Sequence, residues 1–313
     1  MELRRLRYFV TVVEEGGFTR AAARLHLSQP GLSAQIRQLE RELGQPLLDR
    51  SGRTVTPTEV GRAVLPYARA ALAAVAGARQ AVDAYTGLLR GRVTLGTVSG
   101  VAGEAFELPA LLAEFRDAHP GVEVSLTEDS SERMRAALLS GELDLALLGT
   151  ADAEPPPGLA YRVVVDEPLA VAVADTDPLA GREEVALAEL AERQLICLPR
   201  GTGVRAVLER ACARAGFAPR VAFEAASPQL VRQLAARGLG PAVLPWGDEP
   251  VPDGLRVLRL VRPTLRGRVA LAHRAAGPPS PAARAFLTHL HTTLPDGGPA
   301  SGRRDADVAR GSR

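Results

Sequence analysis

The stretch from Phe18 to Thr58 constrains the fold more than any other part of this sequence. It reads FTRAAARLHLSQPGLSAQIRQLERELGQPLLDRSGRTVTPT, which predicts two short helices with a tight turn, a two-stranded wing and the start of a longer helix. In the second short helix Ser28 is the expected N-cap, and Pro30 lies in the first turn, where its missing N–H costs no hydrogen bond. Apolar residues spaced by four, three and four bury one stripe of that helix, at Leu32, Ile36, Leu39 and Leu43.

The polar face of this helix is the candidate DNA-reading surface. Gln and Arg can bond adenine and guanine edges in the major groove, and each good pair contributes about 1–3 kcal/mol of discrimination. A solvated polar face would look similar on a lone helix, but the short helix before it and the wing after it favour the groove. In the first short helix, expected at 19–25, Thr19 is a candidate cap whose neighbouring N–H groups can hold a phosphate. The expected contacts from the two helices are Thr19, Ser28, Gln29, Pro30, Ser33, Gln35, Arg37, Gln38 and Arg41.

The wing is predicted from residues 47–50, a turn at Ser51-Gly52 and residues 53–55. Arg50 and Arg53 are its candidate DNA contacts, with Arg53 at the tip, where it can meet a phosphate or the minor groove. The next residues, 56–59, predict a capping box with Pro57 at the first helical position. All 38 basic residues of the chain are arginine, so phosphate contacts must come from arginine or from neutral donors.

The N-terminal stretch resembles the winged helix-turn-helix of LysR-type transcriptional regulators. The matching residues, all in register, are Ala22-Ala23-Arg24-Leu25, Ser28-Gln29-Pro30-Gly31-Leu32-Ser33, Gln35-Ile36, Leu39-Glu40, Leu43-Gly44 and Leu47-Leu48-Asp49-Arg50. The resemblance implies a regulator that binds double-stranded promoter DNA as a homodimer or homotetramer and responds to a small-molecule effector, with RNA polymerase as a further candidate partner. Three residues depart from the family pattern. Gly31 replaces the commoner alanine, Leu48 stands where phenylalanine is usual, and Ala34 occupies a position that is often arginine.

A long helix is predicted from residue 58 to about residue 89. Apolar residues alternate by four and three along it, at Val64, Ala68, Ala71, Val75, Ala78, Val82, Tyr85 and Leu89. This seam is consistent with a helix buried within the chain, whereas the family resemblance implies a linker helix that pairs with a second copy. Pro66 predicts a bend near its first turns.

From Arg92 onward, short strands alternate with helices, which predicts an α/β fold with a parallel sheet. Strands are expected at 92–98, 122–127, 143–148, 160–165, 168–174, 194–198, 220–224, 240–244, 255–260 and 267–273. Helices are expected at 104–118, 131–140, 186–192, 203–215, 227–237 and 281–294.

The family resemblance extends to about residue 295, on the phrases HPGVEVSLTEDSS, GELDLALLG and EAASPQLVRQLAARGLGPAVLP. It implies two Rossmann-like lobes joined by two crossover strands, similar to type 2 periplasmic binding proteins. The expected organisation is a winged helix-turn-helix domain at 1–58, a linker helix at 59–90, an effector-binding domain at 91–295 and a disordered tail at 296–313. Lobe one would comprise 92–164 and 267–295, and lobe two 165–266.

Ligands of such folds sit between the lobes at the carboxyl ends of strands. The candidate effector-binding residues there are Thr97, Ser99, Gly100, Ser130, Ser131, Thr150, Arg200, Thr202 and Ser227. Most lie where helices begin, so each Ser or Thr can equally be an N-cap. Arg200 and Arg205 beside helix N-termini suit an anionic ligand, a carboxylate or a phosphate.

Several other functions remain as alternatives or are disfavoured. The loop at Gly201 and Gly203, with Glu224 about twenty residues on, mimics a dinucleotide fingerprint, so a nucleotide-dependent oxidoreductase is the alternative. No catalytic constellation accompanies it, and no cofactor or metal is expected. Cys197 and Cys212 are expected to be core thiols, with a redox switch as the second interpretation. No membrane span or secretory signal is recognised, which favours a cytoplasmic protein over an exported solute-binding protein.

Overall fold

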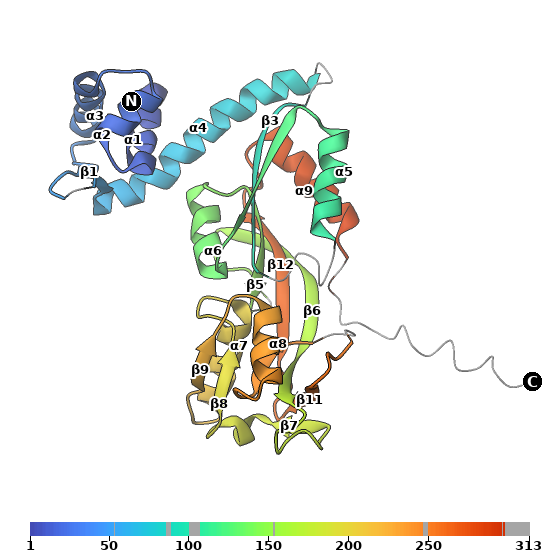
Figure 1. Ribbon diagram of the computed structural model, residues 1–313. Coiled ribbons are helices and arrows are strands. Elements are labelled where there is room, and N and C mark those ends of the chain that lie inside the picture. The colour runs from blue at the N-terminus through green and yellow to red at the C-terminus, as the bar shows by residue number, and fades with distance from the viewer. Residues whose placement is uncertain are drawn as a thin grey trace, which may run out of the picture.

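The computed structural model describes residues 1–52, 54–85, 89–99, 107–152, 154–246, 250–295 and 297, with the backbone alone described over 79–85. A helical N-terminal unit, a long helix and an α/β unit follow one another along the chain (Figure 1). The predicted contacts Arg53 and Gly100, and all of the predicted tail except Gly297, lie outside the described residues. The N-terminal elements are α1 (Leu3–Glu15), α2 (Phe18–Arg24), α3 (Gln29–Leu43), β1 (Leu48–Asp49) and β2 (Thr56–Pro57).

The first residues of these helices agree with the sequence at α3 and differ elsewhere. Ser28 caps α3, because its Oγ accepts a hydrogen bond from the backbone N–H of Gly31 at 3.3 Å. Helix α2 begins one residue earlier than predicted and has Gly17 as its N-cap, so Thr19 is not a cap. The capping box expected at 56–59 is also wrong. Pro57 belongs to β2, where it pairs with Leu48, and Thr58 caps the next helix through the N–H of Gly61 at 2.9 Å.

The core of the N-terminal unit joins α1, α3 and the wing. Phe9, Leu32, Ile36, Leu39 and Leu47 have no exposed surface. The wing strands pair antiparallel, and the second lies a few residues after the predicted 53–55. The apolar stripe read from the sequence therefore does hold α3 against its neighbours and turns the opposite face outward.

The linker helix α4 spans Glu59–Tyr85 and uses its apolar seam in two ways. Near its start, Val64, Ala68 and Ala71 pack into the core of the N-terminal unit. Further along, Val75 is 38% exposed and Ala78 is exposed. The first half of the seam is thus buried within the chain, while the described part of its second half faces outward.

The α/β unit is built on one ten-stranded sheet in the order β4-β3-β5-β12-β6-β10-β8-β9, with β11 and β7 branching from β6. Its strands are β3 (Gly91–Thr97), β4 (Val122–Glu128), β5 (Leu145–Thr150), β6 (Leu159–Ala174), β7 (Glu184–Ala186), β8 (Gln194–Cys197), β9 (Arg220–Glu224), β10 (Ala242–Pro245), β11 (Leu255–Val261) and β12 (Arg266–Arg274). Its helices are α5 (Leu108–Ala118), α6 (Ser131–Ser140), the short 3-10 helix η1 (Leu187–Leu190), α7 (Gly203–Arg214), α8 (Pro228–Ala236) and α9 (Pro281–Thr293).

The sheet is mixed, so the predicted parallel sheet is correct only in part. β3 pairs in parallel with β4 and β5, and β8 pairs in parallel with β9 and β10. β12 runs antiparallel to β5 and β6, and β6 runs antiparallel to β10 and β11. The predicted strands 160–165 and 168–174 are a single strand, β6, and the sequence missed β7.

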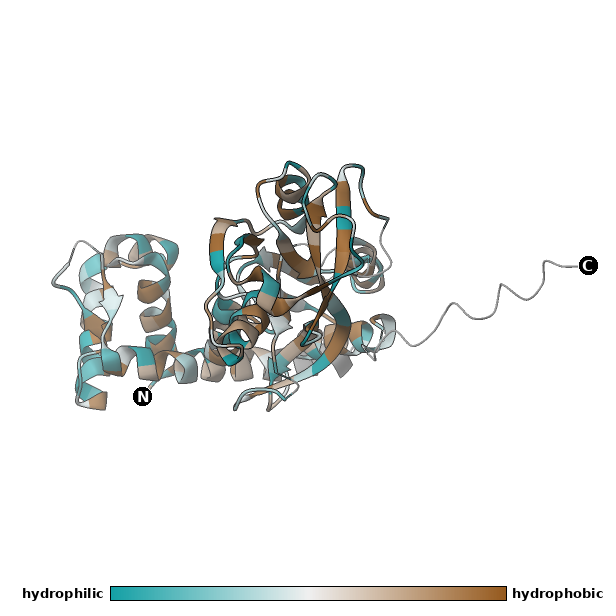
Figure 2. Ribbon diagram, turned by 90° about the horizontal axis from the view of Figure 1, so that it is seen from below, coloured by the Kyte–Doolittle hydropathy of each residue, from teal (hydrophilic) through white to brown (hydrophobic). Residues whose placement is uncertain are grey.

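Two apolar cores lie on either side of the crossover strands β6 and β12. We call the part around β3, β4 and β5 lobe one, where α9 and α5 pack through Phe286 and Phe115. The part around β8, β9 and β10 is lobe two, where α7 packs through Leu208 and Cys212. In Figure 2 the strands are largely brown while the surrounding helices alternate brown and teal, as expected of a buried sheet covered by amphipathic helices.

Candidate nucleic-acid interface and effector cavity

The outward face of α3 carries most of the predicted DNA contacts. Ser28, Gln29 and Pro30 are exposed at its first turn, and Arg37 and Arg41 are exposed farther along. Arg37 donates to the Ser33 hydroxyl at 3.0 Å, which leaves that hydroxyl largely buried beneath the guanidinium. The surface that can meet DNA therefore consists of the helix start and a pair of arginines.

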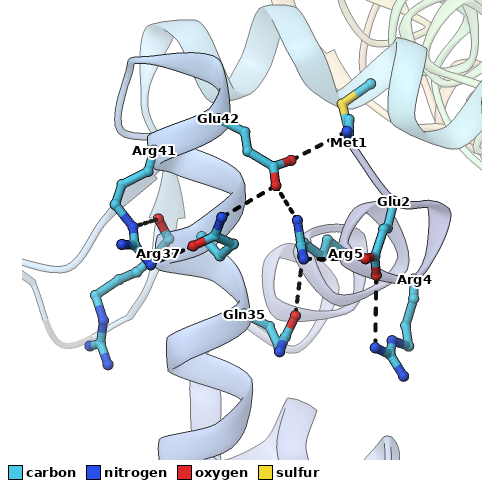
Figure 3. A network of polar contacts seen from close by, with 9 residues as sticks. Met1, Glu2, Arg4, Arg5, Gln35, Arg37, Arg41 and Glu42 are labelled. Carbon is cyan, nitrogen blue, oxygen red and sulfur yellow. Dashed lines mark hydrogen bonds and ion pairs between the residues drawn. The ribbon is translucent and has the colours of Figure 1, made fainter.

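Other predicted residues of α3 turn toward α1 (Figure 3). Gln35 is half-buried and accepts a hydrogen bond from Arg5 Nε at 3.2 Å. Glu42 accepts from Arg5 and from Gln38, the latter at 3.4 Å, and pairs with the terminal amine of Met1 at 3.4 Å. The hydrogen bond from Gln38 and the Arg5 contact hold the pKa of Glu42 below its ordinary value. Gln35 and Gln38 thus belong to a network that fastens α3 to α1.

A second network fixes the wing. Glu40 accepts hydrogen bonds from the backbone N–H groups of Leu47 at 3.0 Å and Leu48 at 3.3 Å. Its other oxygen pairs with Arg50 at 2.8 Å, and the Arg50 guanidinium lies 5.0 Å from the centre of the Phe18 ring. Arg50 is therefore held by the protein itself, whereas Thr19 on α2 is exposed.

A cavity of about 400 Å³ lies where the two lobes meet the crossover strands. Lobe one contributes the ends of β3, β4 and β5 and the start of α6, and lobe two contributes the loop before α7 and the start of α8. Its lining residues are Val98, Ser99, Glu128, Asp129, Ser130, Ser131, Gly149, Val165, Glu167, Leu198, Pro199, Arg200, Thr202, Gly203, Val204, Ala226, Pro228, Arg232, Pro245, Gly267, Arg268 and Val269. The carboxyl ends of strands from both lobes meet here, as the sequence predicts.

The structure brings together part of the predicted effector set. The residues that line the cavity are Ser99, Ser130, Ser131, Arg200 and Thr202.

Thr97, Thr150 and Ser227 do not line the cavity. Thr97 and Thr150 are buried, and Thr150 bonds the backbone of Asp152. Ser227 is exposed at the start of α8. These three residues lie beside the cavity wall without reaching the cavity.

Most of the hydroxyls also have structural partners. Ser130, Thr202 and Ser227 accept hydrogen bonds from backbone N–H groups three residues on, so each is an N-cap. Ser131 Oγ accepts from the N–H of Gly149 at 2.9 Å. The N-cap interpretation is correct for these three residues, and Ser130 and Thr202 place two helix N-termini at the cavity wall.

The sequence did not single out several charged residues of the lining. Arg268 comes from β12 and donates to Asp166 at 3.2 Å, and the Arg232 guanidinium lies 5.2 Å from the centre of the Trp246 ring. Glu128, Asp129 and Glu167 add acidic groups. Strand β12 reaches the cavity only through its long-range pairing with β5 and β6. No local motif in the sequence indicates that contact.

Arg205 was expected to favour an anionic ligand, and the structure gives it another role. Its guanidinium is buried and pairs with Glu209 at 2.8 Å and Glu224 at 2.7 Å. Arg200, in contrast, is 80% exposed and lies 3.4 Å from Glu209. Glu224, which the dinucleotide interpretation reserves for a ribose, is therefore engaged by Arg205.

The two glycines at the lobe contact leave no space for side chains. A Cβ on Gly203 would lie 2.6 Å from the carbonyl carbon of Gly149 and 2.6 Å from the nitrogen of Thr150. Because these are backbone atoms, the lobes would have to separate to admit a methyl group. This glycine supports close lobe contact instead of a pyrophosphate cradle.

Both cysteines are core residues, as expected. Cys197 on β8 and Cys212 on α7 are buried in the apolar core of lobe two. Burial raises the pKa of the Cys197 thiol to about 12 and that of the Cys212 thiol to about 11. Both are therefore neutral thiols near pH 7. Among the described residues, no group of His, Cys, Asp and Glu could hold a metal ion. Nor does the described part of the chain contain a helix long and apolar enough to cross a membrane.

Comparisons with known families and relatives agree with this architecture. Residues 3–62 match the bacterial regulatory helix-turn-helix protein, lysR family, and residues 86–295 match the LysR substrate binding domain. The chain is 38% identical over 250 residues to the HTH-type transcriptional regulator ShiR of Corynebacterium glutamicum, covering 79% of this chain and 83% of that protein. It is 32% identical over 286 residues to the DNA-binding transcriptional dual regulator OxyR of Escherichia coli, covering 89% and 91%.

Solved structures match along nearly the whole chain. Full-length OxyR from Pseudomonas aeruginosa is similar with a TM-score of 0.71 at 27% identity, covering 93% of this chain and 95% of that one. Full-length CbnR in complex with its target DNA is similar with a TM-score of 0.56 at 26% identity, covering 93% and 99%.

A helix-turn-helix unit joined by a linker helix to a two-lobed unit with a cavity defines a DNA-binding transcriptional regulator with an effector-binding domain. The chain belongs to the LysR family of such regulators. The relatives are transcriptional regulators and not enzymes, so the oxidoreductase alternative is wrong.

Proposed function

We propose that this regulator reads a dyad-symmetric promoter site with α3 and responds to a small anionic effector in the cavity between its lobes. The exposed start of α3 supports the first half, because Ser28, Gln29 and Pro30 precede Arg37 and Arg41 along one outward face. Thr19 and the wing arginine Arg53 complete the proposed contacts to the DNA backbone. Gln35, Gln38 and Arg50 contribute by positioning α3 and the wing, as their partners within the protein indicate.

The charge of the cavity wall carries the anion proposal. Arg200, Arg232 and Arg268 line it, and α6 and α7 direct their N-termini toward it. Guanidinium groups and helix N-termini both stabilise carboxylates and phosphates. The acidic residue Asp129 accepts a hydrogen bond from the N–H of Ser130 at 2.7 Å, which offsets part of its charge.

Self-association is proposed from the second half of the α4 seam. Val75 is 38% exposed there, and a helix with an exposed apolar seam gains by pairing with a copy of itself. A homodimer or homotetramer would match a dyad-symmetric DNA site. RNA polymerase is a further proposed partner, and action on DNA in a bacterial cell places the proposed site of function in the cytoplasm.

A second candidate function comes from relatives whose names describe hydrogen peroxide-inducible activators. Such a role through cysteine requires an accessible thiolate. Cys197 and Cys212 are buried and their pKa values are raised, which disfavours peroxide sensing by either thiol. The cavity therefore supports a bound small molecule better than the thiols support peroxide.

Fluorescence of Trp246, the single tryptophan of the chain, tests the effector proposal. It lies beside Arg232 at the cavity wall, so a ligand there should change its emission. We would titrate the full chain with inorganic phosphate and a panel of small mono- and dicarboxylates, with their methyl esters as uncharged controls. Saturable binding of an acid but not its ester, lost in Arg268→Gln, is expected. Equal binding of acid and ester would refute the anion requirement.

A further inference from the structure

Helix α6 extends from the cavity between the lobes to the linker helix. Ser130 and Ser131 at its start line the cavity, and it ends at Gly141, which has the left-handed backbone conformation at φ 76°. Ten residues of helix span about 15 Å. The next residue, Glu142, forms an ion pair with Arg69 of α4. One rigid element therefore contacts both the cavity wall and the helix that leads to the DNA-binding unit.

The start of α6 is bonded to lobe two as well as to lobe one. The N–H of Glu132 donates to the carbonyl oxygen of Gly201 at 3.3 Å, across the lobe boundary. On the other side, Ser131 Oγ accepts from the N–H of Gly149 at 2.9 Å. A ligand that changes the separation of the lobes must change one of these contacts, so α6 is connected directly to lobe movement.

The end of α6 meets a chain of charged groups that reaches the helix-turn-helix. Arg69 is only 11% exposed, and besides Glu142 it lies 3.9 Å from Glu14 of α1. Glu14 pairs in turn with Arg24 of α2 at 3.1 Å. Because Arg69 is mostly buried, its attraction to Glu142 is screened less by salt than that of an exposed pair. Arg69 thus joins the two units within one protomer.

The packing around Arg69 leaves little room for independent movement. A Cβ on Gly141 would lie 2.8 Å from Arg274 Nη1 and 3.7 Å from the Cβ of Arg69. Eight residues further along α4, a Cβ on Gly77 would lie 2.7 Å from the carbonyl oxygen of Pro279, before α9. Helix α4 is therefore held on lobe one at two points, and only the contact at Arg69 also reaches α1.

We propose that α6 and the Arg69–Glu142 ion pair transmit the state of the cavity to the DNA-binding unit, with Arg69 as the positioning residue. The inference rests on the proposed function, because it requires the cavity to control DNA binding. Coupling of this kind needs contacts that differ between two states. Separation of the lobes shifts the start of α6, and the shift at Glu142 changes how Arg69 holds α4 against α1.

A substitution can act as the trigger, so that no effector needs to be known. Gly203→Ala places a methyl group 2.6 Å from backbone atoms of lobe one and forces the lobes apart. The readout is the Kd of the full chain for a DNA site that the wild-type protein selects from random duplexes. Coupling of the usual size changes that Kd by about fivefold or more. If Gly203→Ala does not fold, Gly149→Ala serves as the trigger, since its Cβ would lie 3.0 Å from the nitrogen of Gly203.

The same trigger is then measured in Arg69→Ala, in Glu142→Gln and in the double variant. We expect its effect on Kd to fall below about twofold in each, without further loss in the double variant, because both residues act through one contact. DNA affinity without the trigger should stay close to wild type. Arg116→Ala is the matched control, since Arg116 is 71% exposed on α5 and pairs only with Asp117 among the partners that the structure describes. It should leave the effect of the trigger unchanged.

The outcomes separate this inference from the proposed function. If the trigger changes the Kd equally with and without Arg69, the inference is wrong and the proposed function stands. If the trigger leaves the Kd of the otherwise wild-type chain unchanged, lobe separation does not control DNA binding, and both fail.

Discussion

The thiols of Cys197 and Cys212 should not react with hydrogen peroxide while the protein is folded. Burial raises the pKa of Cys197 from its ordinary value of 9.0 to about 12, and that of Cys212 to about 11. Each pKa unit lowers the thiolate fraction tenfold at neutral pH, so the Cys197 thiolate is about a thousandfold scarcer than in an exposed cysteine. Peroxide attacks the thiolate, and Cys197 is also only 1% exposed.

The assay is peroxide treatment of the full chain, followed by mass spectrometry and by measurement of DNA affinity. We expect no sulfenic acid or disulfide at either cysteine and the same DNA affinity in wild type, Cys197→Ser and Cys212→Ser. In denaturant, where both thiols are exposed, labelling should become rapid. Rapid oxidation of the folded protein at neutral pH, with a change in DNA affinity that either serine variant abolishes, would refute the burial argument and favour a peroxide sensor.

Three further substitutions test the packing and the DNA contacts. Glu40→Ala removes a carboxylate that bonds two backbone amides of the wing and one arginine, so we expect a loss of about 2–3 kcal/mol from the N-terminal unit in urea unfolding. Glu40→Gln, which keeps an acceptor oxygen, should lose less, and equal loss would contradict the assignment. Gly77→Ala should lower the thermal midpoint, because its Cβ would lie 2.7 Å from the carbonyl oxygen of Pro279, whereas Gly181→Ala, with open space around it, should not. Arg53→Ala should weaken binding to all DNA sequences and reduce the salt dependence of the Kd, and an unchanged salt slope would exclude a phosphate contact.

Local patterns were sufficient to predict the N-terminal unit and most helices of the lobes. The stripe through Leu32 and Ile36 and the cap at Ser28 depend on residues within a few positions of one another, so the sequence alone indicates them. The break predicted within β6 fails at Pro168, which lacks an N–H and interrupts the apolar run. In the folded chain β6 changes partners around this point, from β12 to β10 and β11, and remains one strand.

The chemistry of the cavity was less predictable because it depends on contacts between distant residues. Arg268 reaches the lining through strand pairing with β5 and β6, and Arg205 is withdrawn from it by Glu224 on a neighbouring strand. Likewise, nothing in the local sequence distinguishes Gln35, which bonds Arg5, from the outward residues of the same helix. In each case a partner far along the chain decides whether a polar side chain faces a ligand or the protein.

Selection of DNA sites by the full-length protein tests the central claim most directly. The wild-type chain should enrich one dyad-symmetric sequence from random duplexes, and Arg37→Ala should bind that site and random DNA with nearly equal affinity at the same salt concentration. A good arginine–guanine contact accounts for about 1–3 kcal/mol, so the specificity ratio should fall by about tenfold or more. An unchanged ratio for Arg37→Ala, together with an unchanged enriched sequence, would contradict the claim that α3 reads the major groove.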